Sequence, residues 1–108
     1  MKPTTHLIKS CLKGKQKAQS ELYRLCFPYL MSIAVRYHHN QEDAVNVLNL
    51  AFYKIITKLK QFNIENSFKA WCRTILVNTI ISEFRKNQTY IKSMSPTDFE
   101  MEQGNLAN

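Results

Sequence analysis

Glycine and proline are scarce in this sequence, with 2 and 3 residues respectively among 108. Loop-rich folds and folds built from many β-turns depend on these residues, so their scarcity argues against both classes. No apolar run approaches the roughly 18 residues of a transmembrane helix, and no apolar stretch of signal-peptide length lies near the first methionine. We therefore expect a cytoplasmic protein that does not enter a membrane.

Cysteines and acidic residues are also few. Cys11, Cys26 and Cys72 are odd in number and lack paired spacing, so we expect free, buried thiols in a reducing compartment. The chain has 8 acidic residues and 15 lysines and arginines, which gives a formal charge of +7. Five of the lysines fall within residues 1–20, where no acid occurs. This balance indicates an anionic partner or a contribution to solubility, and charge alone does not choose between them.

Apolar residues make up 44% of the chain and recur at spacings of three and four, the pattern of amphipathic helices. We predict four helices, over residues 5–12, 17–37, 41–60 and 68–86. Because no stretch has a strand pattern, the expected fold is all-α, a compact bundle of three to four helices. Gly14 should end the first helix, and Asn40 and Ser67 should cap the last two. Pro28 should kink or locally break the second helix.

The end of the chain differs from the rest. Residues 89–108 lose the apolar periodicity and contain one lysine against three acids. We expect a helical domain over residues 1–88, followed by a flexible tail or the start of an interdomain linker over residues 89–108.

One face of the third predicted helix carries unexpected apolar bulk. At about 100° per residue, five residues lie opposite the core stripe: Asn46, Asn49, Leu50, Tyr53 and Thr57. Single exposed apolar residues are ordinary. This face is therefore either a plain solvated surface or a surface that contacts another protein.

The fourth predicted helix is apolar on two sides, which indicates a helix packed between neighbours. A narrow stripe with hydrogen-bonding groups, one large aromatic ring and no acid remains between them: Trp71, Thr74, Asn78, Ser82 and Arg85. The stripe fits a binding surface. It equally fits an ordinary solvated face with Trp71 in the core.

The segment before this helix, residues 62–69, combines two aromatic rings with amides, a hydroxyl and a lysine. Single-stranded nucleic acid is bound by such a mixture, because rings stack on bases, amides read base edges and cations contact phosphates. The alternative is that Phe62 and Phe68 only fix the loop to the core.

Three groups of residues, in order, link the chain to a known family. They are Glu21-Leu22-Tyr23-Arg24 with Pro28-Tyr29-Leu30; Asn40-Gln41-Glu42-Asp43-Ala44 with Leu48 and Phe52; and Phe62, Ser67-Phe68-Lys69-Ala70-Trp71, Asn78-Thr79 and Phe84-Arg85-Lys86. With these residues the chain resembles region 2 of bacterial sigma factors, especially the small extracytoplasmic-function (ECF) type.

The resemblance implies a non-enzymatic transcription initiation factor. Such domains bind the β′ clamp helices of the RNA polymerase core and capture the non-template strand of the promoter −10 element, single-stranded during melting. The DNA-binding candidates that it implies are Phe62, Asn63, Ser67, Phe68, Lys69, Trp71, Asn78, Arg85 and Lys86. The polymerase-binding candidates are Asp43, Asn46, Asn49, Leu50 and Tyr53.

The chain departs from this family at the polymerase-facing helix. Asn46, Asn49 and Leu50 stand where the family usually has Asp, Gln and an acidic residue, so we expect a shifted interface with apolar contacts from Leu50 and Tyr53. A second interpretation is a sigma-like interaction module, for example one that docks an anti-sigma factor, without promoter activity. A third is an unrelated helical domain that reads duplex DNA.

Two further expectations concern what the chain does not carry. Catalytic, metal and cofactor sites have no support, because the sequence lacks a Gly-rich phosphate loop and histidine or cysteine ligands at zinc spacing. The residues after Arg85 are too few for the second DNA-binding domain of full-length members. We therefore expect either a fragment of a longer sigma factor or a naturally short protein.

Overall fold

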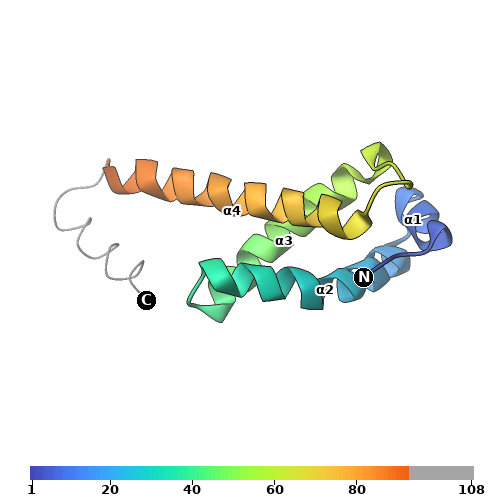
Figure 1. Ribbon diagram of the computed structural model, residues 1–108, viewed down its shortest axis with the longest axis horizontal. Helices are drawn as coiled ribbons and strands as arrows, with labels where there is room; N and C mark the ends of the chain where they lie inside the picture. The colour runs from blue at the N-terminus through green and yellow to red at the C-terminus, as the bar shows by residue number, and fades with distance from the viewer. Residues whose placement is uncertain (93–108) are drawn as a thin grey trace.

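The computed structural model describes residues 1–92, with side chains to residue 87. Its helices are α1 (Thr5–Leu12), α2 (Gln16–Tyr37), α3 (Gln41–Thr57) and α4 (Phe68–Lys92), and a short 3₁₀ turn, η1 (Leu59–Gln61), follows α3 (Figure 1). This part of the chain contains no strand, which confirms the predicted all-α bundle. None of its helices is long and apolar enough to cross a membrane.

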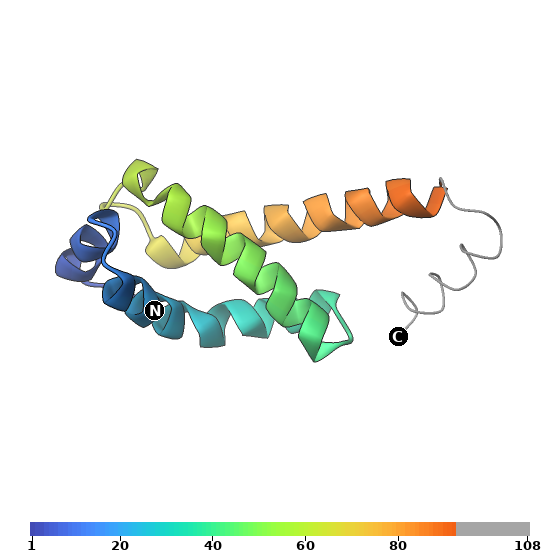
Figure 2. The ribbon, with the colours of Figure 1, turned by 180° about the vertical axis from the view of Figure 1, so that it is seen from behind.

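Three long helices form the body of the molecule. α2 packs against α3 and α4, and α3 packs against α4. Figures 1 and 2 show α1 at one end of this body, beside η1 and the loop that leads into α4. The N-terminal segment and the loop before α4 are therefore neighbours, although about sixty residues separate them in the sequence.

The core lies where these helices meet. Its largest fully buried side chains come from α2, α3, η1 and α4: Leu22, Leu30, Leu48, Ile55, Leu59, Leu76 and Ile80. Thr79 is the one buried polar residue among the described residues, and its hydroxyl donates to the Ile75 carbonyl at 2.7 Å. Cys11, Cys26 and Cys72 are free and buried, as predicted.

The predicted helix boundaries are partly confirmed by local hydrogen bonds. Asn40 Oδ1 accepts from the Glu42 amide at 2.7 Å, and Ser67 Oγ accepts from the Ala70 amide at 3.1 Å, so both caps are present. Gly14 follows the end of α1 with φ +79°, a backbone conformation that favours glycine.

Two expected helix ends were wrong, and the local break considered at Pro28 does not occur. α2 continues through Pro28, which lies on its exposed side, where water can hydrate the carbonyl that loses its amide donor. The third helix ends as an α-helix at Thr57, and its last turn tightens into η1. α4 continues to Lys92 instead of ending at Lys86, because neither glycine nor proline interrupts it.

The predicted tail extends beyond the described residues, and the division into a domain of residues 1–88 and a tail stays a prediction.

Candidate nucleic-acid and protein interfaces

Three aromatic rings cluster where the loop enters α4. The centroid of the Phe62 ring lies 5.2 Å from that of Phe68 and 5.1 Å from that of Trp71, and the Phe68 and Trp71 rings are 5.8 Å apart. Phe68 is buried with 5% of its surface exposed, whereas Phe62 and Trp71 are half-buried. Phe68 therefore anchors the loop to the core, and the other two rings keep part of their surface open to a ligand.

The loop between η1 and α4 is held by its own polar groups. Asn63 Oδ1 accepts from the Glu65 amide at 3.0 Å, and the Asn63 carbonyl accepts from the Asn66 amide at 2.9 Å. Ser67 caps α4 through its hydroxyl oxygen. Asn63 and Ser67 are exposed, but their side-chain oxygen atoms already accept hydrogen bonds from backbone amides. Their remaining donors, the Asn63 amide nitrogen and the Ser67 hydroxyl hydrogen, are the groups that can face a ligand.

A cavity of about 460 Å³ opens beside this loop. Phe62 and residues 64–69 line one side of it, and Met1, Lys2, Pro3, Thr5 and Ile8 line the other. The loop side of this cavity follows from the sequence pattern, whereas the N-terminal side does not. No local pattern signals that these distant segments meet, because the meeting depends on how α1 packs against the body.

The remaining candidate residues for nucleic-acid binding lie along α4. Lys69 lies in the first turn, with Nζ 4.6 Å from the centre of the Tyr29 ring. Asn78 and Arg85 are exposed at seven-residue intervals from Trp71, so the three share one side of the helix. Lys86 is exposed and forms a 3.8 Å ion pair with Glu83. At 1.5 Å per residue, Trp71 and Arg85 are roughly 21 Å apart along the helix axis.

The candidate residues on α3 form a separate surface. Asn46, Asn49, Leu50 and Tyr53 are all exposed, as the periodicity predicted, and so is Asp43 in the first turn. Leu50 is 46% exposed and Tyr53 is 70% exposed, so both present apolar surface to solvent.

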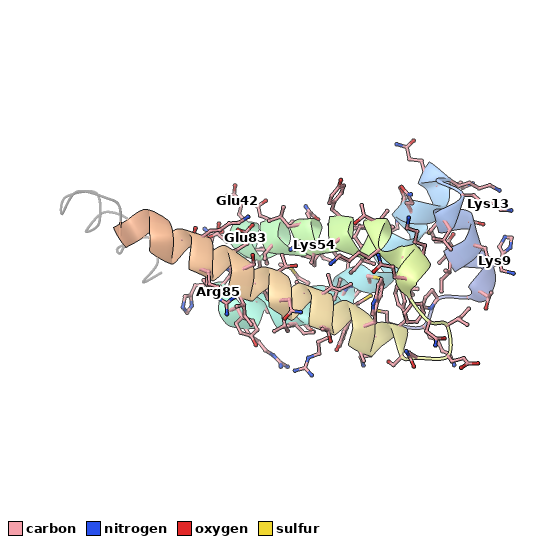
Figure 3. All side chains as sticks on the ribbon, turned by 90° about the horizontal axis from the view of Figure 1, so that it is seen from above. Lys9, Lys13, Glu42, Lys54, Glu83 and Arg85 are labelled. Atoms are coloured by element: carbon pink, nitrogen blue, oxygen red, sulfur yellow. The ribbon has the colours of Figure 1, made fainter. Side chains whose placement is uncertain are left out.

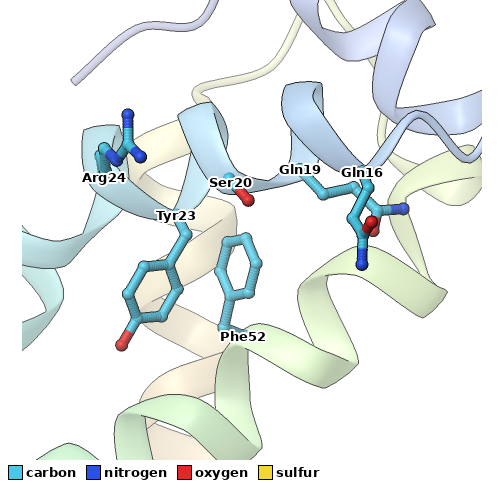
Figure 4. Close-up of a pocket in the computed structure, with 6 residues that line it drawn as sticks. All are labelled: Gln16, Gln19, Ser20, Tyr23, Arg24 and Phe52. Carbon is cyan, nitrogen blue, oxygen red and sulfur yellow. The ribbon is translucent and has the colours of Figure 1, made fainter.

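Asn49 connects this surface to α2. Its Oδ1 accepts a 2.6 Å hydrogen bond from the Tyr23 hydroxyl, and the Tyr23 ring meets Phe52 edge-on with centroids 5.0 Å apart. A hollow of about 430 Å³ lies beside these rings, and it is also lined by Gln16, Gln19, Ser20 and Arg24 (Figure 4). The sequence analysis did not identify α2 as part of this surface, because the contact joins residues far apart in the chain.

The lysines near the N-terminus lie apart from the polar stripe on α4 that runs from Trp71 to Arg85. Figure 3 shows Lys9 on α1 and Lys13 just after α1 at one end of the molecule, and Arg85 toward the other end. These two lysines are exposed. They can attract an anion at long range, whereas direct contact with a ligand on α4 requires the residues of the stripe and the loop.

The buried thiols join two of the helices. A hydrogen bond between Cys72 on α4 and Cys26 on α2, together with burial, raises the pKa of the Cys72 thiol far above its usual range. Burial also raises the pKa of Cys11, and nearby Cys26 and Glu21 add to this effect. Neutral thiols are poor nucleophiles and poor metal ligands, so Cys11 and Cys72 act as small core residues.

Comparison with known proteins gives one match. Residues 22–90 match the sequence model of the family described as Sigma-70 region 2. These residues are more than half of the chain and include most of α2, all of α3, the loop and nearly all of α4. The N-terminal segment and α1 lie outside the match. No curated protein and no solved structure matches the chain.

Proposed function

Because this chain belongs to the sigma-70 region 2 family, whose role lies in transcription initiation with RNA polymerase and promoter DNA, we propose that it captures one melted promoter strand. The strand is the non-template strand of the −10 element, and it binds to the loop and to the stripe on α4. The polymerase core binds to the exposed face of α3 through its β′ clamp helices. This proposal assigns the chain to the ECF type and to the cytoplasm.

The half-buried rings of Phe62 and Trp71 carry the proposal for strand binding. Melting a promoter removes base pairing and base stacking, and a protein must offset both losses. The partly exposed rings of Phe62 on the loop and Trp71 on α4 can stack on bases, and each stacked base contributes about 1–3 kcal/mol. Lys69, Arg85 and Lys86 lie along the same helix and can contact phosphates.

Asn63 and Asn78 supply exposed amides to this surface. Amides can bond the Watson–Crick edges of unpaired bases, which base pairing occupies in a duplex. The surface therefore suits a strand whose bases are splayed out, and the domain should prefer single-stranded DNA over duplex.

The exposed pair Leu50 and Tyr53 supports the proposal for polymerase binding. The two residues are about one helical turn apart, so they form one apolar contact area beside the polar side chains of Asn46 and Asn49. Tyrosine is frequent among the residues that dominate the energy of protein interfaces. The loss of the usual acidic residues from this face favours a contact that depends on apolar burial more than on charge.

Titration of labelled DNA tests the proposal directly. Because the promoter sequence is unknown, the probe is a single strand with a randomised centre, compared with the duplex made from it, with and without core polymerase. We expect the single strand to bind better than the duplex, and core polymerase to strengthen its binding. Equal affinity for the duplex would support a duplex-reading helical domain instead.

A sigma-like interaction module is the second candidate function. The substituted face of α3 favours it, because Asn46, Asn49 and Leu50 carry neither of the usual charges of a clamp-binding helix. An absence of DNA binding, both with and without polymerase, would support this candidate and exclude the first. Its partner would then be an anti-sigma factor that docks on the apolar area of Leu50 and Tyr53.

A further inference from the structure

The cavity beside the loop has two walls, and only one belongs to the part of the chain that matches the family. The loop wall falls within residues 22–90, whereas Met1, Lys2, Pro3, Thr5 and Ile8 precede that match. Its volume of about 460 Å³ falls in the range of roughly 300–1,000 Å³ typical of ligand pockets.

The N-terminal wall is anchored to the rest of the molecule. Ile8 is buried in the core, and Met1 packs against the core from the other end of the segment. Thr4 Oγ1 accepts from the Leu7 amide at 3.1 Å, which caps α1. α1 in turn packs against α2 and η1. Pro3 adds a fixed φ angle between these anchors. The wall therefore keeps a defined position beside the loop.

The charged side chains that line the cavity are those of Lys2, Lys69 and Glu65. Lys69 is engaged with the Tyr29 ring, which lies 4.6 Å away. Lys2 is exposed, and within the described part of the chain its ammonium makes no ion pair. Among these side chains, Lys2 is therefore the cation that can contact an anion without giving up another contact.

We propose that the N-terminal segment forms the second wall of the strand-binding site, with Lys2 contacting a phosphate of the nucleotide that enters the cavity. This inference rests on the proposed function, because the anion that it assigns to Lys2 belongs to the captured strand. Phe62 and the polar loop residues face the base from the opposite wall. Lys2 acts as a positioning residue: a phosphate contact fixes the register of the strand and carries no base information.

The first test compares two lysines that carry the same charge, one that lines the cavity and one that lies outside it. Lys2→Gln removes the cation from the cavity, whereas Lys13→Gln removes an exposed cation from the end of α1, outside this cavity. Both variants are titrated with the same labelled single strand at several salt concentrations. We expect Lys2→Gln to weaken binding roughly two- to fivefold, the range for an exposed ion pair. The salt slope should fall by about 0.7, the value for one phosphate contact on a single strand.

Lys13→Gln should change affinity and salt slope much less. If both variants lose the same affinity, the N-terminal charge acts only as general attraction, and the proposal for Lys2 is overturned while strand binding stands. If the unmodified protein binds no single strand, the proposed function itself fails. These two failures are therefore distinguishable in one experiment.

A neutral backbone linkage identifies the phosphate. Single strands with one methylphosphonate at successive positions are bound to the unmodified protein and to Lys2→Gln. At one linkage we expect the methylphosphonate to weaken binding of the unmodified protein but to have no further effect on Lys2→Gln. Equal effects in both proteins at every linkage would overturn the proposal. Lys2→Arg, which keeps the charge, should retain the affinity, and a loss as large as that of Lys2→Gln would also overturn it.

Discussion

Trp71 is the single tryptophan of the chain, so its fluorescence reports on one known place. It is half-buried beside Phe62 and Phe68, and part of its ring remains open to solvent. If bases stack there, addition of single-stranded DNA should quench the emission of Trp71. Polyphosphate at equal charge is the control, since it binds lysines without stacking. Equal quenching by both would contradict a stacking role.

Trp71→Ala separates binding from packing. We expect single-strand affinity to fall by about 1–3 kcal/mol, the contribution of one stacked base. The free energy of unfolding should also fall, by less than the roughly 3–5 kcal/mol lost with a fully buried ring. DNA titration and circular dichroism measure the two effects. A loss of stability without a loss of affinity would make Trp71 a core residue only.

Cys11 and Cys72 should be slow to react. The hydrogen bond to Cys26 and burial raise the pKa of Cys72, and burial raises the pKa of Cys11. Because the raised pKa keeps both thiols protonated at neutral and mildly alkaline pH, and the thiolate is the reactive form, alkylation should be slow in the folded protein. Raising the pH from about 7 to 9 should accelerate labelling of urea-unfolded protein much more than labelling of the folded protein. Rapid labelling of Cys72 before unfolding would contradict its burial.

At the scale of single elements, the face of α3 gives the clearest experiment. Leu50→Glu places a charge in the apolar area that we assign to polymerase, and it should weaken core binding at least about fivefold, since contacts at the centre of an interface exceed about 1 kcal/mol. The fold should survive, because Leu50 is 46% exposed.

Leu12→Glu is the matched control for this prediction. Leu12 is 48% exposed at the end of α1, so the substitution has the same chemistry at a distant site. Its polymerase affinity should stay close to that of the unmodified protein. Comparable losses in both variants, measured in a core-binding assay, would remove α3 as the specific contact.

The sequence predicts these elements well wherever the cause is local. Asn40 and Ser67 act within three residues of themselves, and the outward direction of Leu50 and Tyr53 follows from helical spacing. The local break considered at Pro28 does not occur, because a helix packed on one side can leave the affected carbonyl to water on the other. The contact between Tyr23 and Asn49 could not be predicted, since it joins residues 26 positions apart on different helices. The N-terminal wall of the cavity was missed for the same reason.

For the whole molecule, stability depends on the junction of α2, α3 and α4. Leu48 is fully buried in the middle of α3. Leu48→Ala should lower the free energy of unfolding by about 2–5 kcal/mol, through lost apolar burial and the cavity left behind. Each kcal/mol should lower Tm by roughly 4–8 °C in a domain of this size. Val35→Ala, at a site 48% exposed, should cost under about 0.5 kcal/mol. A Leu48→Ala protein as stable as the control would contradict a core at this junction.

The hydrogen bonds of Asn63 and Ser67 have a consequence for the thermodynamics of strand capture. They order the loop when the chain folds, so its conformational entropy is lost before DNA arrives and does not oppose binding. The heat-capacity change of strand binding should then reflect only the ring surface that the bases cover, without the larger contribution of a segment that folds on its ligand.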